Sequence, residues 1–283
     1  MSTGVKRETL IIGAPASLWL VVLLVIPCLF LLFQSLTPLS GTGLSLENYE
    51  NLVESGTFQK ALRRSIIVSV WVTVLTVLAG YPIALVASRA SPRVRTLVMV
   101  IVIFPFLLSA VVRAYGWTVI LGENGVVNDF LIGIGLIAEP LRLIQNTFAI
   151  IIGETHVLLP YMVLSLLTVI QRIDRNLEAA AMSLGASPPV IFFKVVVPLT
   201  LPGLLTGMLL VFSLSMTAFA TPFLLGGPRS PILTVLMYQY AYTLFDWSKA
   251  TAVAGVLLVL GLGFVILHRF VSRRLMRDAE AGR

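Results

Sequence analysis

Two polar side chains that could take part in chemistry, Glu154 and His156, lie inside a strongly apolar stretch over 146–171. An acid in such a stretch usually faces protein or a water-filled path, and it often marks a functional site in a membrane protein. One interpretation is that Glu154 meets a cationic substrate in a translocation path. The other is that Glu154 lies near the external end of its helix, within reach of water or of Arg113. For His156 the sequence favours a hydrogen bond between helices over a role as a ligand.

Three further residues are candidates for the same path. Arg113 lies toward the end of another apolar stretch, where it could pair with an acid, act as a gate or extend to the membrane surface. Thr217 and Phe219 lie in a later apolar stretch and could line the path. Hydroxyl groups in such helices also form hydrogen bonds between helices, so Thr217 has a second, purely structural interpretation.

The sequence contains no pattern that is typical of an enzyme. It has no G-x-x-x-x-G-K-[ST] phosphate-binding loop, no H-E-x-x-H zinc motif, and no nucleophile with a plausible base. Cys28 is the single cysteine, which excludes an internal disulfide and a cysteine-rich metal site. We therefore expect neither catalysis nor a bound cofactor or metal in this chain, and an intramembrane enzyme is the least favoured class.

Composition predicts an integral membrane protein. Of the 283 residues, 58% are hydrophobic and only 12% are charged, which is about half the charged fraction that a soluble domain carries. The net charge of +7 does not indicate nucleic-acid binding, since the basic residues are distributed as membrane orientation requires. We expect an all-α polytopic membrane protein that is surrounded by a lipid bilayer.

The apolar stretches predict six transmembrane helices, because about 20 residues cross the hydrocarbon core. The six cover 10–35, 65–88, 96–121, 146–171, 203–225 and 250–267. Pro105 is a candidate for a kink in the third helix. The segment over 122–145 carries too many charges to cross lipid, so we expect a re-entrant or interfacial element there. Most of the 20 Lys and Arg residues fall on the side of the two termini, which predicts that both termini are cytoplasmic.

A polar segment over 172–202 has the sequence signals of two short helices. Apolar residues recur at helical spacing from Leu177, and Gly185 stands where a glycine commonly ends a helix. The Ser-Pro pair at 187–188 is typical of the start of a following helix. We expect this second helix to end before Pro198. The charge distribution places the segment in the cytoplasm.

This segment resembles the EAA loop of type I permeases, the transmembrane subunits of binding-protein-dependent ABC importers. The resemblance rests on a glutamate, two alanines, a glycine, an apolar residue and a proline at the family's spacing: Glu178, Ala180, Ala181, Gly185, Val195 and Pro198. The family's usual glutamate comes one position later, where this chain has Ala179, so the role of Glu178 is the least certain of the six. The resemblance extends over about 62–268.

The resemblance implies a six-helix type I fold in which these six residues couple the membrane helices to an ATPase. It implies a location in the bacterial inner membrane and four partner subunits. These are a second, related permease, two ATPase subunits that bind ATP and Mg²⁺, and an external substrate-binding protein. A heterodimer of permeases is favoured, and a homodimer is left open. The implied division is a first helix and external segment over 1–61, a permease core over 62–268 with the coupling loop at 172–202, and a basic cytoplasmic tail over 269–283.

Two other segments, 113–117 and 218–227, resemble the spermidine/putrescine branch of this family. That resemblance implies a polyamine substrate, with other small cations, amino-acid derivatives and ferric iron left open. The main alternative in function is a secondary transporter or channel, which would need no ATPase. It predicts ion-coupling polar residues across several helices, whereas this sequence offers Glu154 and His156.

Overall fold

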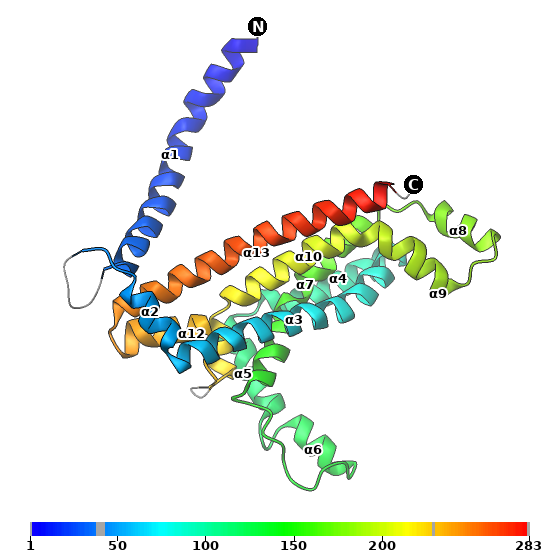
Figure 1. Cartoon of the computed structure of the whole chain (residues 1–283). Coiled ribbons are helices and arrows are strands. Elements are labelled where there is room, and N and C mark those ends of the chain that lie inside the picture. The colour runs from blue at the N-terminus through cyan, green and yellow to red at the C-terminus, as the bar shows by residue number, and fades with distance from the viewer. Residues whose placement is uncertain (1, 38–42, 228–229, 282–283) are drawn as a thin grey trace. The chain divides into compact units, whose positions relative to one another are not determined.

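The computed structural model describes residues 2–37, 43–227 and 230–281, and its regular structure is helical throughout (Figure 1). The first helices are α1 (Ser2–Ser35), α2 (Glu47–Glu54), α3 (Gly56–Arg89), α4 (Pro92–Leu107), α5 (Ala110–Leu121), α6 (Val126–Gly133) and α7 (Thr147–Ile170). They are followed by α8 (Arg175–Ser183), α9 (Pro188–Ile191), the π-helical turn η1 (Phe192–Val196), α10 (Val197–Thr217), α11 (Ala220–Leu225), α12 (Leu233–Tyr238), the π-helical turn η2 (Gln239–Thr243) and α13 (Trp247–Ala281). The part of the chain that is described contains no strand, and the predicted all-α fold is confirmed.

Five helical segments are long and apolar enough to cross a membrane. They are Leu18–Ser35, Gly56–Arg89, Thr147–Ile170, Pro188–Thr217 and Trp247–Arg273. A sixth crossing follows if α4 and the α5–α6 segment, which bend by 101° across a short break, form one span. The predicted polytopic membrane protein is confirmed, and the fourth predicted helix agrees closely with α7.

The third predicted span, over 96–121, is not one continuous helix. α4 ends at Leu107, and Leu108 is extended. Ser109 then acts as the N-cap of α5, because its hydroxyl oxygen accepts a hydrogen bond from the backbone N–H of Val112 at 3.2 Å. Pro105 removes a backbone donor shortly before this break. A proline followed closely by a capping serine therefore breaks the helix where the sequence alone predicts only a kink.

The helix that begins at Pro188 does not end before Pro198, contrary to the prediction. α9 continues through η1 into α10, so that Pro188–Thr217 is one helical run. Pro198 has no N–H to donate. The wider π-turn η1 before it makes room for the proline ring and lets the helix continue without that hydrogen bond. The predicted fifth span over 203–225 is divided instead at its other end, where the helix breaks between α10 and α11.

The chain divides into two compact units, and the smaller one comprises residues up to Gln59 together with Leu236–Leu258. Within this unit α2 is fastened to the end of α1. Asn48 Nδ2 donates to the carbonyl oxygens of Ser35 and Thr37 at 3.0 and 2.9 Å. The hydroxyl groups of Tyr49 and Ser35 are hydrogen-bonded at 2.8 Å. The predicted external segment after the first helix includes residues 38–42, which lie outside the described residues.

The larger unit comprises Lys60–Val235 and Val259–Arg283, and its core forms around α7. Gly203 and Gly207, one turn apart on α10, allow α7 to approach closely: a Cβ atom on Gly207 would lie 2.7 Å from the Met162 sulfur. Ser165 Oγ donates to the carbonyl oxygen of Gly203 at 2.7 Å. Small residues with a hydrogen bond across the contact hold transmembrane helices together, since lipid provides no hydrophobic driving force between them.

The segment over 122–145 contains α6 and a loop that is organised by the buried Asn128. Its amide nitrogen donates to the carbonyl oxygens of Gly122 and Leu141, both at 2.9 Å, and its oxygen accepts from the N–H of Leu141 at 2.8 Å. Non-helical backbone at membrane depth is tolerated only where its polar groups find partners within the protein. One asparagine provides three such bonds, which suits a re-entrant or interfacial element.

Candidate coupling loop and intramembrane polar site

Local sequence signals set both ends of α8. Asp174 Oδ1 accepts a hydrogen bond at 2.9 Å from the backbone N–H two residues further on, which caps the first turn. At the other end Gly185 adopts φ +85°. The N–H groups of Gly185 and the next residue donate to the carbonyls of Met182 and Ala181, at 2.9 and 3.0 Å. These two bonds close a helix at a left-handed residue, so the predicted position of Gly185 is confirmed.

The other predicted coupling residues lie along the same loop. Ala180 is exposed and Ala181 half-buried on α8, Val195 is half-buried in η1, and Pro198 is exposed in the first turn of α10. The two alanines keep this side of α8 thin, because neither side chain extends beyond Cβ. Another protein surface can therefore approach the α8 backbone closely.

Large apolar side chains also project from the loop. No residue of α8 is buried, and Leu184 and Phe193 are 88% and 68% exposed. Met182 is exposed on the same loop. Large apolar side chains exposed on an otherwise polar segment favour an interaction site. The loop thus has the form of one half of a protein interface.

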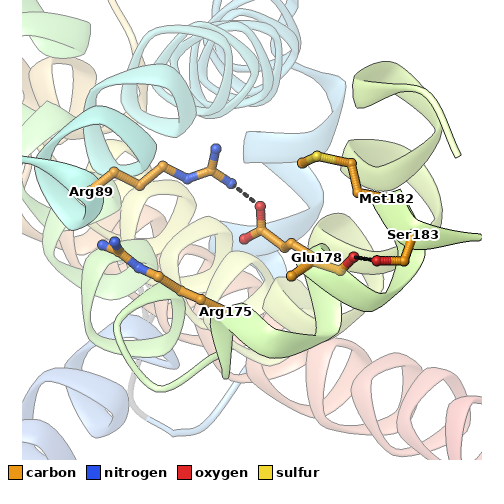
Figure 2. Close-up of a pocket in the computed structure, with 6 residues that line it drawn as sticks. Arg89, Arg175, Glu178, Met182 and Ser183 are labelled. Atoms are coloured by element: carbon orange, nitrogen blue, oxygen red, sulfur yellow. Dashed lines mark hydrogen bonds and ion pairs between the residues drawn. The ribbon is translucent and has the colours of Figure 1, made fainter. Parts of the chain in front are cut away.

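Glu178, the acid one position from the family's usual place, forms an ion pair that ties α8 to the end of α3. Arg89 Nη2 donates to Glu178 Oε2 at 2.6 Å, and Figure 2 shows the two side chains pointing toward one another. Arg175 Nη2 also reaches the carbonyl oxygen of Ser88 at 3.4 Å. Both contacts connect the first half of the loop to the last turn of the same transmembrane helix.

A second connection joins α3 to the other half of the loop. The hydroxyl groups of Tyr81 and Thr200 are hydrogen-bonded at 2.7 Å, which links α3 to α10. The Tyr81 ring also packs edge-on against Phe192 in η1, with 5.3 Å between ring centroids. α3 therefore contacts both α8 and the η1–α10 helix.

Glu154 lies within the protein interior between α7 and α10. Its side chain is only 1% exposed, and Glu154 Oε2 accepts a hydrogen bond from the hydroxyl of Ser215. The other carboxylate oxygen has no hydrogen-bond partner among the described groups. This burial contradicts the interpretation from the sequence in which Glu154 contacts water at the end of its helix. A contact between Glu154 and a cationic substrate stays a prediction.

Arg113 and His156 each have a structural partner. Arg113 Nη1 donates to the carbonyl oxygens of Pro105 and Leu108, at 2.8 and 3.1 Å, so it satisfies backbone groups that are freed at the break between α4 and α5. His156 Nδ1 accepts from Trp117 Nε1 at 3.3 Å, which is the predicted hydrogen bond between helices. No ion pair between Arg113 and Glu154 is present in the part of the chain that the structure describes.

The break after α10 contains the two remaining path candidates. Thr217 is exposed at the end of α10, and its hydroxyl donates to the carbonyl of Ser213 at 3.0 Å. Phe219 is half-buried in the break itself. Thr234 Oγ1 donates to the carbonyl oxygen of Ala218 at 2.6 Å and so satisfies the interrupted backbone. Broken helices of this kind accompany substrate sites in many transporters, and this break follows closely on the residue that contacts Glu154.

The candidate site consists of an exposed loop and a buried carboxyl group. Among the residues that the structure describes, no cluster of His, Cys, Asp and Glu could hold a metal ion. Some polar groups of the membrane region join helices or satisfy backbone carbonyls at the two breaks, whereas the buried hydroxyls of Ser69, Thr155 and Ser213 have no hydrogen-bond partner among the described groups. The exposed loop is capped at both ends and is hydrogen-bonded to α3.

Residues 77–277 match the family described as the inner membrane component of binding-protein-dependent transport systems. The chain belongs to this family. The permease is 32% identical to the spermidine/putrescine transport system permease protein PotB of Haemophilus influenzae, over 93% of both chains. It is 31% identical to PotB of Escherichia coli, over 93% of its own length and 97% of that protein. It is also 30% identical to the molybdenum transport system permease protein ModB of Mycobacterium tuberculosis, over 75% and 81% of the two chains.

Solved structures have the same fold as the permease. A chain of a bacterial ABC transporter for import of the acidic polysaccharide alginate superposes with a TM-score of 0.77 at 21% identity, covering 96% of the permease and 97% of that chain. A chain of the inward-facing MetNI methionine ABC transporter gives a TM-score of 0.60 at 17% identity, covering 78% and 99%. The permease is therefore a multi-pass inner-membrane subunit of an ABC importer and has the type I fold.

The sequence did not reveal the partners of the predicted site residues. Arg89 belongs to a short basic turn, and nothing in that turn identifies Glu178 as its partner. Ser215 and Trp117, which contact Glu154 and His156, lie 61 and 39 residues away from them in the chain. Such pairs could be found only from covariation between related sequences, because no local pattern requires them.

Proposed function

We propose that this permease moves a polyamine such as spermidine or putrescine across the inner membrane. The observation that carries the proposal is its similarity to the PotB permeases along nearly the whole length of both chains. The ModB relatives, which are named for molybdenum transport, match a shorter part of the permease. A buried carboxyl group beside a helix break also suits a substrate that carries ammonium groups, since an ammonium group can donate a charge-assisted hydrogen bond to a carboxylate.

The proposed partners follow from membership of the family and, for the ATPase, from the exposed surface of the coupling loop. The exposed apolar residues of the coupling loop would dock onto an ATPase subunit, and two such subunits would bind ATP and Mg²⁺. A second, related permease would complete the translocation path as a heterodimer, and an external binding protein would deliver the substrate. Both termini and the coupling loop would then be cytoplasmic, as the distribution of basic residues requires.

The contacts of α3 suggest how movement passes from the ATPase to the membrane. A displaced α8 would pull on the end of α3 through Arg89 and Glu178. The same displacement would act on α10 directly, because α9, η1 and α10 form one helical run. Movement of α10 relative to α7 would change the contact between Ser215 and Glu154 at the far end of that run. Opening and closing of the path would in this way depend on ATP binding in a partner.

Glu154 would then act as a temporary partner for the substrate. One of its carboxylate oxygens already lacks a hydrogen-bond donor among the described groups, and separation of α7 from α10 would free the second. An ammonium group that enters the path would find a carboxylate with two available oxygens, and a charge-assisted hydrogen bond is about twice as strong as a neutral one. Return of the Ser215 hydroxyl would favour release.

Reconstitution tests this proposal. The permease would be purified with its ATPases and its partner permease, placed in vesicles with the external binding protein outside, and assayed for uptake of radiolabelled spermidine. We expect uptake that requires both ATP inside the vesicles and the binding protein. Uptake that an ion gradient drives without an ATPase would instead support a secondary transporter, and ATP-dependent uptake of molybdate but not spermidine would overturn the polyamine assignment.

A further inference from the structure

A surface groove lies between α10 and the last part of α13, and it does not include Glu154. One wall is a stripe on α10 at helical spacing, formed by Pro202, Leu205, Thr206 and Leu209. The facing wall is a matching stripe on α13 that runs from Val265 to Arg273. Residues three and four positions apart share one face of a helix, so each wall is continuous.

The two helices are antiparallel, and this gives the groove two chemically different ends. Leu209 and Val265 form an apolar end, and nearby the rings of Phe212 and Phe264 stack with 3.9 Å between their centroids. The opposite end is polar and cationic and is formed by Ser272, Arg269 and Arg273, with Thr206 between the two ends. The groove thus changes from apolar to basic along its length.

The floor of the basic end is held in place by hydrogen bonds. A ring nitrogen of His268, Nε2, lies 2.7 Å from the carbonyl oxygen of Leu205, which fixes α13 against α10. The hydroxyl of Ser272, a nearly buried residue, lies 3.3 Å from the same nitrogen. The groove is therefore a built feature of the packing between these helices.

The two arginines of the groove have no acidic partner among the described side chains, which end at Arg273. Arg269 and Arg273 are exposed and lie one helical turn apart. No carboxylate pairs with either guanidinium among the side chains that the structure describes. Two unpaired guanidinium groups on one face create a positive site that suits a phosphate, because arginine binds phosphate oxygens with two parallel hydrogen bonds.

We propose that this groove binds one anionic phospholipid of the cytoplasmic leaflet. Its acyl chains would lie along Leu209 and Val265, and its phosphate would contact Arg269 and Arg273. A soluble phosphate would leave the apolar half of the groove empty, whereas a phospholipid matches both halves. Basic pockets between transmembrane helices on the cytoplasmic side are typical binding sites for anionic head groups. The inference rests on the proposed cytoplasmic orientation of the C-terminus, and it does not depend on the transported substrate.

Native mass spectrometry of the whole importer tests this inference. The complex would be extracted in mild detergent and titrated with phosphatidylglycerol or with phosphatidylcholine. We expect preferential retention of phosphatidylglycerol, weakened about fivefold by either Arg269→Gln or Arg273→Gln, since each basic residue near a membrane surface contributes about that much. Arg93→Gln is the matched control, because Arg93 is an exposed arginine on the same proposed side and outside the groove. Equal retention of the two lipids, or an equal loss in the Arg93 variant, would overturn the inference.

A second measurement identifies what occupies the groove in the native membrane. A photoreactive amino acid would replace Thr206, which is exposed between the two ends of the groove. A covalent adduct with a phospholipid, detected by its mass, supports the inference, and an adduct with another subunit shows that a protein covers this surface. Neither readout requires uptake or ATP, so failure of the lipid site and failure of the proposed transport function can be distinguished.

Discussion

The coupling loop and the Glu154 site are opposite in construction. α8 has no buried residue, and its ends are set by capping signals within the loop itself. Glu154 is buried, and the one donor to it among the described groups, Ser215, comes from a distant part of the chain. The loop is therefore shaped by local signals and exposes its surface, whereas the Glu154 site is shaped by packing between distant segments. This difference suits the two proposed roles, which are contact with an ATPase for the loop and contact with a cation for Glu154.

The largest expected effect is that of Glu154→Gln on uptake. Glutamine keeps an oxygen that can accept the Ser215 hydrogen bond but cannot carry a negative charge. If an ammonium group binds here in transit, loss of a charged hydrogen bond that contributes about 3 kcal/mol should reduce spermidine uptake about a hundredfold. Uptake by the reconstituted importer, with the exposed Glu139→Gln as the control, measures this. Normal uptake would leave Glu154 as a packing residue.

A bulky residue at Gly185 should have the next largest effect. A Cβ atom there meets nothing within 4 Å, so Gly185→Val changes the backbone preference and not the packing of this chain. A left-handed conformation costs an ordinary residue about 1–2 kcal/mol, which lowers the population of the correctly shaped loop about 5- to 30-fold. We expect normal membrane insertion but uptake uncoupled from ATP hydrolysis.

Gly261→Val is the matched control for the Gly185 substitution. Gly261 also has open space around its Cβ position, and it is helical with no left-handed φ. Comparing ATPase activity and uptake in the two variants distinguishes the effect of a changed loop shape from the effect of introducing a valine side chain elsewhere. Equal uptake in wild type and Gly185→Val would remove the coupling role that we assign to the turn.

The same division between local and distant causes explains how much the sequence could predict. The ends of α8 follow from Asp174 and Gly185, because a helix cap involves residues only a few positions apart. The membrane helices follow from long apolar stretches. The wrong predictions concern Pro198 and the third span, where a proline does not by itself decide between continuation, kink and break. η1 allows the helix to continue at Pro198, and Ser109 completes the break that follows Pro105.

Arg113 is a candidate for the translocation path from the sequence, but in the structure its guanidinium group donates hydrogen bonds to backbone carbonyl oxygens. Arg113→Gln should destabilise the break between α4 and α5 by about 1.5 kcal/mol, the contribution of a hydrogen bond to a charged group. Thermal unfolding of the complex should show this, with Arg142→Gln as the control, since Arg142 is exposed and its nearest acid lies at 4.0 Å. An unchanged melting temperature combined with altered substrate selectivity would instead place Arg113 in the path.

The smallest expected effect is that of breaking the ion pair between Arg89 and Glu178. Exchanging the two charges measures it separately from other effects of the substitutions. The pair is partly exposed, so its contribution should not exceed about 1 kcal/mol, or about fivefold in uptake. Arg89→Glu and Glu178→Arg should each weaken coupling, because each variant places two like charges where the two atoms of the ion pair lie 2.6 Å apart. The double variant should recover most of the loss, provided that the pair serves only to hold α8 against α3. If Glu178→Arg is as defective in the double variant as alone, the carboxylate itself contacts the ATPase, and the shifted glutamate has kept the function of the family's usual one.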